Sequence, residues 1–193
     1  MDSTAAASPL AHGLLVGTGV VWVGLELRQG IKRRPEGVKA NWTSELVFRL
    51  VVVAGILVGT VLSRVAPTAA IGSAVAVWIG LGLLWCGIAL RLWSVRTLGR
   101  YFTVIVQTSR DQPVITDGPY RLIRHPSYAG LLLAVTGVGL VIGNWWSLIS
   151  LTVGMAVGLV FRIRVEERAL LRDLGDDYRD YAATHKRLIP FVW

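Results

Sequence analysis

Apolar residues gather into five runs along the chain, which short polar segments separate. The runs cover residues 10–27, 46–66, 71–93, 128–143 and 145–161. The first three approach or reach the ~20 residues that a helix needs to cross ~30 Å of hydrocarbon. Buried helices of a soluble protein are the alternative, but five such runs in one short chain favour lipid as the solvent. The pattern therefore predicts an all-α, polytopic membrane protein with five transmembrane helices.

The last two runs are shorter and are separated only by the corner Gly143–Asn144–Trp145. We predict that they form a tight helical hairpin, with Trp145 and Trp146 in the aromatic belt at the membrane surface. Beyond the fifth run, apolar residues recur at helical spacing up to Tyr181, with Gly175 as a break. This spacing predicts a C-terminal amphipathic helical segment along the cytoplasmic interface. The whole chain, residues 1–193, is expected to be one integral membrane domain.

Basic residues are unequally distributed between the two ends of the predicted helices. They follow the first and third runs and fill the tail, whereas the opposite side has only Arg64 near a helix end. Because cytoplasmic loops carry the excess of Lys and Arg, we predict an outside N-terminus and cytoplasmic polar segments. The hydrophobic fraction of 53% and the mean hydropathy of +0.56 agree with a membrane protein. The net charge of +8 then reflects topology and contact with membrane lipids, so we expect no nucleic-acid partner.

The glycines and the single cysteine bear on helix packing, disulfides and metal sites. Glycines four residues apart allow close helix packing in lipid, and we expect contacts within the chain in preference to a dimer, whose existence the sequence leaves open. These pairs are Gly13/Gly17, Gly55/Gly59 and Gly154/Gly158. Cys86 is the only cysteine, so an internal disulfide is impossible, and we expect no metal site.

Polar chemistry concentrates in residues 94–127 and 162–193, which flank the predicted hairpin on one side of the membrane. Arg124 and His125 precede Pro126, which suits the first turn of a helix, and a helix N-terminus with basic neighbours favours an anion. The alternative is that the arginine anchors lipid headgroups and the histidine caps the helix. We weigh both interpretations equally from this segment alone.

Two adjacent carboxylates, Glu166 and Glu167, follow the fifth run by about one turn. Ionised carboxylates are costly there unless they are paired. Surface ion pairs along the helix with Arg162 and Arg164 are the simplest explanation, and they account for one glutamate better than for both. Together the two polar segments suit a cofactor that has a cation, a carboxylate, a ribose and a purine.

These motifs resemble the isoprenylcysteine carboxyl methyltransferase family of integral membrane enzymes. The resemblance rests on GPYRLIRHPSYAG at residues 118–130, on the Glu pair, and on LGDDYRDYAATHKRLIP at residues 174–190. It covers roughly residues 96–193, which is the expected catalytic part, and the order and spacing of the three elements make it specific. The first two helices match only in length and hydrophobicity.

The resemblance implies S-adenosyl-L-methionine as cofactor, S-adenosyl-L-homocysteine as product, and a lipophilic or prenylated substrate that enters from the bilayer. It assigns Arg124, Glu167 and Arg187 to catalysis, the two arginines as groups that orient a substrate carboxylate. It assigns the cofactor pocket to seven residues: Val114, Ile115, Tyr120, His125, Tyr128, Glu166 and Glu167. Val114 and Ile115 are expected to line the adenine through their backbone.

The expected reaction is transfer of the sulfonium methyl to a carboxylate, which is already ionised at neutral pH because its pKa lies near ~4. An amine acceptor must first lose a proton, and this difference favours O-methylation. Phospholipid N-methylation and an NADPH-dependent membrane reductase on a similar scaffold remain alternatives, as does a structural or lipid-binding protein. The sequence does not identify the methyl acceptor.

Overall fold

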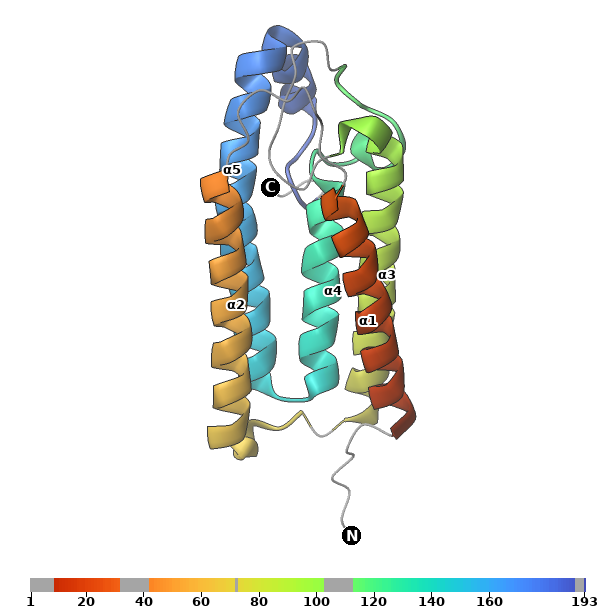
Figure 1. Ribbon diagram of the computed structural model, residues 1–193, viewed down its shortest axis with the longest axis vertical. Helices are drawn as coiled ribbons and strands as arrows, with labels where there is room; N and C mark the ends of the chain where they lie inside the picture. Colours follow the sequence, from red (N-terminus) through yellow and green to blue (C-terminus); the bar gives the residue numbers. More distant parts are fainter. Residues whose placement is uncertain (1–8, 32–41, 72, 103–112, 190–192) are drawn as a thin grey trace.

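A computed structural model describes residues 9–31, 42–71, 73–102, 113–189 and Trp193. In this part of the chain there are α-helices and short 3-10 turns and no strand, so the all-α prediction is confirmed for it. The elements are α1 (Pro9–Ile31), α2 (Trp42–Val65), η1 (Pro67–Ala69), α3 (Ala74–Leu98), η2 (Gly99–Tyr101), η3 (Gly118–Arg121), α4 (Pro126–Ile142) and α5 (Trp145–Thr184). Successive α-helices run in opposite directions along the long axis of the molecule (Figure 1).

Among the described residues, three helices are long and apolar enough to cross a membrane: Thr43–Val65, Ala74–Tyr101 and Trp145–Thr184. Gly13–Glu26 and Pro126–Ile142 are shorter apolar helices. Large apolar side chains lie open on the outer surface, with Leu50 60% exposed, Trp78 50% exposed and Val153 55% exposed. Such a surface suits hydrocarbon and not water. The chain is therefore an integral membrane protein.

Helices α3 and α4 pack with their backbones almost in contact. A Cβ atom added to Gly87 would lie 2.5 Å from the carbonyl oxygen of Gly130, and one added to Gly137 would lie 2.4 Å from that of Gly80. Only glycine fits at such distances. The seam fixes α4 against α3 and thereby fixes the residues that precede α4.

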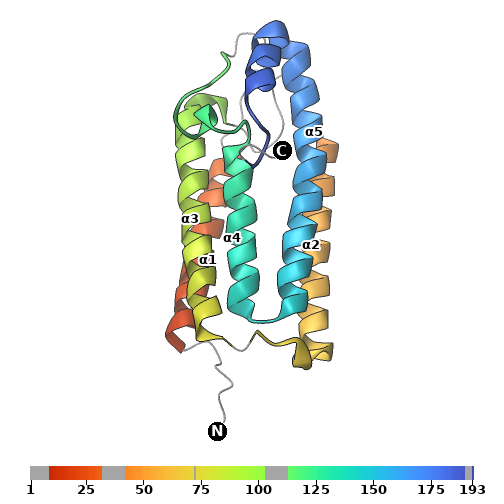
Figure 2. The same ribbon diagram turned by 180° about the vertical axis from the view of Figure 1, so that it is seen from behind.

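Helices α2 and α5 form the second close pair (Figure 2). Two of the predicted glycine pairs serve this contact: Gly55 lies against Gly154, and Gly59 lies against Ser147 and Ser150. The prediction that these glycines serve packing within the chain is thus confirmed for α2. Gly13 and Gly17 of α1, by contrast, face open space.

A two-residue corner connects α4 to α5, and Figure 2 shows the helices running back along each other. Gly143 ends α4 with φ 73°, a left-handed conformation that glycine adopts without strain. Asn144 then caps α5, because its side-chain oxygen accepts from the N–H groups of Trp146 and Ser147 at 2.9 and 3.4 Å. The corner is also tied to the α2–α3 connection, since the N–H of Ile71 donates to the carbonyl of Gly143 at 2.6 Å.

Helix α5 continues past its apolar part, beyond the upper ends of the other helices, and then turns back (Figure 1). The turn is at Gly175, whose φ of 59° is not helical. The predicted break is therefore correct. Between the apolar run and this break α5 continues as one helix, because neither glycine nor proline interrupts residues 162–174.

Candidate functional site

Distant segments meet at the upper end of the bundle, where η3, the start of α4, the outer part of α5 and the C-terminal segment lie together (Figure 1). The N–H of Arg124 donates to the carbonyl of Lys186 at 2.8 Å, and the N–H of His125 donates to that of Arg187 at 2.9 Å. This short parallel pairing places the residues before α4 beside the C-terminal segment. Both then face the glutamates of α5.

The carboxylate of Glu167 is the centre of one cluster and is 6% exposed. Its Oε1 lies 2.9 Å from Nη2 of Arg124 and 3.3 Å from Nε2 of His125. Its Oε2 accepts from Nε of Arg187 at 2.7 Å. We call these four residues the Glu167 cluster. The three residues predicted for catalysis thus converge in space with His125, which was predicted for the cofactor pocket.

The Glu167 cluster carries more positive than negative charge. Two guanidinium groups surround one carboxylate, so the formal sum without the histidine is one positive charge. The side chain of Arg124 is 9% exposed and that of Arg187 is 37% exposed, so the excess charge lies partly buried. Such a site attracts an anionic group and repels a cation.

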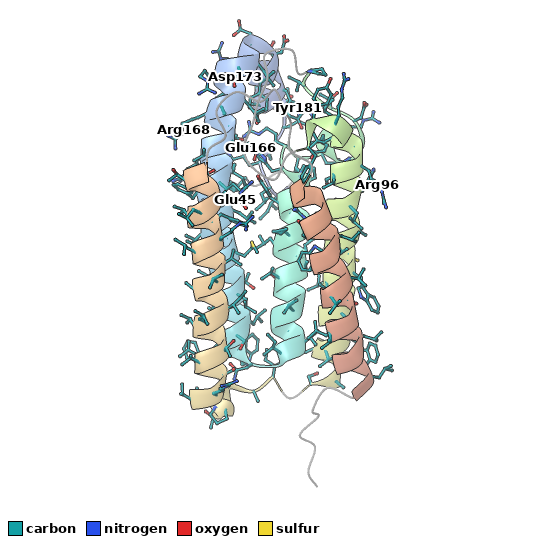
Figure 3. The ribbon with its side chains drawn as sticks, viewed as in Figure 1. Glu45, Arg96, Glu166, Arg168, Asp173 and Tyr181 are labelled. Atoms are coloured by element: carbon teal, nitrogen blue, oxygen red, sulfur yellow. The ribbon has the colours of Figure 1, made fainter. Side chains whose placement is uncertain are left out.

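A second cluster surrounds the hydroxyl of Tyr128, which donates to Oε2 of Glu166 at 2.6 Å. The same hydroxyl accepts from Nε of Arg162 at 2.7 Å. Nη1 of Arg162 forms an ion pair with Glu45 of α2, and both side chains are buried. We call these residues the Tyr128 cluster; Glu45 and Glu166 lie near one another at the upper end of the bundle in Figure 3.

The Tyr128 cluster has the opposite charge balance. It holds two carboxylates and one buried arginine, which pairs with Glu45, and the further partner of Glu45 is Arg49, whose side chain is 67% exposed. The ring of Tyr128 stacks on that of His125, with 5.6 Å between ring centroids, so the two clusters adjoin. A positive region therefore lies next to a region rich in carboxylates.

Arg162 and Glu45 were not among the predicted site residues. Their signal in the sequence is that each is a charged residue beside or within an apolar run, and such residues require partners in lipid. Arg91 of α3 is a similar case: its Nη2 donates to Oε2 of Glu26 and its Nη1 to Oγ of Ser127, each at 2.7 Å. This third group ties α1 and α3 to the start of α4.

The simpler explanations of Glu167 and His125 do not hold here. Glu167 is buried and its ion pairs join it to Arg124 and Arg187, so it does not form a surface ion pair with Arg164, which is exposed. His125 is at the N-cap position of α4, but its side chain makes no capping hydrogen bond. Its ring faces the Glu167 carboxylate instead.

The remaining predicted cofactor residues lie in and before η3. Tyr120 is buried, its backbone carbonyl accepts from the hydroxyl of Tyr181 at 2.7 Å, and burial raises the pKa of its own hydroxyl, which stays neutral. Val114 and Ile115 are half-buried. Among the described residues, these two take no part in the hydrogen bonds around Glu166 and Glu167.

Comparisons with known proteins find methyltransferases that are similar to this chain. The family model for phospholipid methyltransferases matches residues 75–177. The chain is 33% identical over 120 residues to protein-S-isoprenylcysteine O-methyltransferase B of Arabidopsis thaliana, over 60% of this chain and 61% of that protein. It is 32% identical over 114 residues to protein-S-isoprenylcysteine O-methyltransferase of Schizosaccharomyces pombe, over 58% and 48%. In each case the match spans less than two thirds of the relative's length.

A solved structure has a similar fold. The eukaryotic intramembrane Ras methyltransferase ICMT, an isoprenylcysteine carboxyl methyltransferase, superposes with a TM-score of 0.67 at 22% identity. The similarity covers 96% of this chain and 69% of that one. At this identity the likeness concerns the fold, and it includes α1 and α2, which lie outside the matched family region.

The buried pair between Glu45 and Arg162 makes a testable prediction about stability. Glu45→Gln leaves the arginine without its buried countercharge, and loss of one partner of a buried pair costs about 3–5 kcal/mol. The matched change Arg49→Ala removes an exposed partner of the same carboxylate and should cost less than ~1 kcal/mol. We expect a much lower thermal unfolding midpoint in detergent for Glu45→Gln only. Equal midpoints for the two variants would contradict the importance of the buried pair.

Proposed function

Because the chain belongs to the phospholipid methyltransferase family, we propose that it is an S-adenosylmethionine-dependent carboxyl methyltransferase of the membrane. Its acceptor is a lipophilic, isoprenylcysteine-like acid that reaches the site from the bilayer. The names of the relatives support this reaction, and so does the arrangement of charges at the upper end of the bundle. The product is a methyl ester.

One observation carries the choice of a carboxylate acceptor: two arginines from different segments meet on Glu167 and leave an excess of positive charge. An acid approaching the Glu167 cluster is attracted, whereas the ammonium group of an aminophospholipid is repelled. Glu167 is also a poor base, since its two arginines and His125 stabilise the ionised form. N-methylation, which the family description favours, needs a base for the proton of the ammonium group, and Glu167 is committed to its ion pairs.

The methyl donor fits the charged and polar groups of the two clusters. Its sulfonium and ammonium groups suit the carboxylate-rich Tyr128 cluster, where Tyr128 and Glu166 would hold them together with His125. Its purine would lie against Val114, Ile115 and Tyr120. When bound, this cofactor supplies an electrophilic methyl group. Glu167 would serve both ligands, because it fixes Arg124 and Arg187.

The contribution of the protein to the rate is position and desolvation. A carboxylate needs no general base at neutral pH. Arg124 and Arg187 attract and orient it, because guanidinium groups donate charge-assisted hydrogen bonds to carboxylates. Holding the reacting atoms in line supplies several of the ~7–11 kcal/mol available from orientation. Exclusion of water by the apolar helices keeps the anion reactive.

We further propose five transmembrane helices, with the last two as a tight hairpin, an outside N-terminus and a cytoplasmic site. The alternating directions of α1 to α5 support this arrangement, because the ends of α1 and α3 that precede basic segments lie at the same end as the basic outer part of α5 (Figures 1 and 2). The positive-inside rule assigns that end to the cytoplasm.

The acceptor is tested by product chemistry. Purified protein with labelled S-adenosylmethionine and a prenylated cysteine analogue should form a base-labile ester. Arg187→Ala should raise KM for the acid or lower kcat, and Arg187→Lys should restore only part of it, because lysine lacks the planar two-donor grip. Arg96→Ala is the control, since Arg96 is exposed on α3 and points away from the bundle (Figure 3).

Phosphatidylethanolamine is the competing acceptor in the same assay. A base-stable methylated product from this lipid, together with no transfer to any lipophilic acid, would replace the proposed reaction with N-methylation. Binding of NADPH in preference to S-adenosylmethionine would instead indicate a reductase.

Orientation is tested with single cysteines in a Cys86→Ala background. Thr68 and Asp177 are both exposed and lie at opposite ends of the bundle. In intact cells, a membrane-impermeant maleimide should label Thr68→Cys, whereas Asp177→Cys should react only after permeabilisation. The reverse pattern would show that the site faces outward.

A further inference from the structure

Two polar groups at the Glu167 cluster lack a hydrogen-bond partner within the described part of the chain. They are the hydroxyl of Tyr178 and Nε of Arg124. Tyr178 is 4% exposed and the side chain of Arg124 is 9% exposed, so the fold shields both groups from water. Buried donors of this kind are costly and rare in native proteins. Each therefore requires an explanation.

The geometry of Arg124 brings the two donors together. Its Nη2 holds Glu167 at 2.9 Å and its Nη1 donates to the carbonyl of Ala182 at 3.2 Å, which leaves Nε. Ala182 follows Tyr178 by four residues, so both lie on one face of the returning part of α5. Arg124 therefore reaches the turn of α5 that follows Tyr178.

The neighbouring Tyr181 shows what a structural tyrosine does here. Its hydroxyl donates to the carbonyl of Tyr120 at 2.7 Å and so holds η3 against α5. The rings of Tyr178 and Tyr181 are 6.0 Å apart, in the same returning segment. One hydroxyl thus has a bond within the fold, and the other has none among the described residues. Packing alone explains the ring of Tyr178 but not its hydroxyl.

We propose that the Tyr178 hydroxyl and the Arg124 Nε–H together bind a carboxylate group of a ligand at this site. Both groups are donors, a carboxylate offers two acceptor oxygens, and the positive charge of the Glu167 cluster favours an anion. This subsite rests on the proposed function, in which the methyl donor and the acceptor each bring a carboxylate. Tyr178 is then a binding residue that selects ligands by this group.

Tyr178→Phe tests the proposal, with Tyr181→Phe as the matched control. Calorimetry compares S-adenosylhomocysteine with 5′-methylthioadenosine, which has the same nucleoside but no carboxylate, and initial rates give KM for the prenylated acid. Loss of one hydrogen bond to a charged group corresponds to about 10- to 100-fold in affinity. A fall of this size for S-adenosylhomocysteine alone assigns the subsite to the donor. A similar rise in KM with unchanged cofactor affinity assigns it to the acceptor.

Thermal unfolding separates binding from a structural role. Tyr178→Phe removes a hydroxyl without an internal partner, so its unfolding midpoint should not fall, whereas Tyr181→Phe should unfold at a lower temperature. Unchanged S-adenosylhomocysteine affinity and unchanged KM in Tyr178→Phe would overturn the subsite alone, provided the wild type binds and methylates. Equal weakening of both nucleosides with a lower midpoint would also overturn it. A wild-type protein that binds neither nucleoside and forms no ester would overturn the proposed function as well.

Discussion

A carboxylate buried at the end of a membrane helix bundle must be neutralised, and the organisation of this site follows from that requirement at Glu167. Its countercharges come from Arg124, before α4, and from Arg187, in the C-terminal segment. Both arginines lie outside the α-helices, so helical hydrogen bonds do not hold them at the glutamate. The backbone pairing of residues 124–125 with residues 186–187 brings both to the glutamate. One buried charge thus connects three distant parts of the chain.

The bundle below provides the rigid support that this arrangement needs. Gly87 and Gly130 let α3 and α4 approach closely, which fixes the residues at the start of α4. Gly55 and Gly154 do the same for α2 and α5, which fixes the glutamates of α5. The short corner between α4 and α5 joins the two pairs. Close packing within both pairs supports the residues at their upper ends.

The sequence predicts the elements well, because apolar runs, a glycine-asparagine corner and a proline at a helix start are local signals. It also predicts that Arg124, His125 and Glu167 belong together, through the order of the motifs. It does not predict that Arg162 binds Glu45, since these residues are 117 positions apart and no local pattern relates them. The course of α5 after Gly175 is also not predicted, because the glycine indicates a break in the helix but not the direction of the following segment.

The central claim is that the Glu167 cluster organises a methyl-donor site, and calorimetric titration of the purified protein tests it most directly. The account predicts that wild-type protein binds S-adenosylhomocysteine and not NADPH. Glu167→Gln should weaken this binding by about 10- to 100-fold, because one charge-assisted set of hydrogen bonds is lost. Unchanged affinity in a folded Glu167→Gln variant, or preferential binding of NADPH by the wild type, would contradict the account.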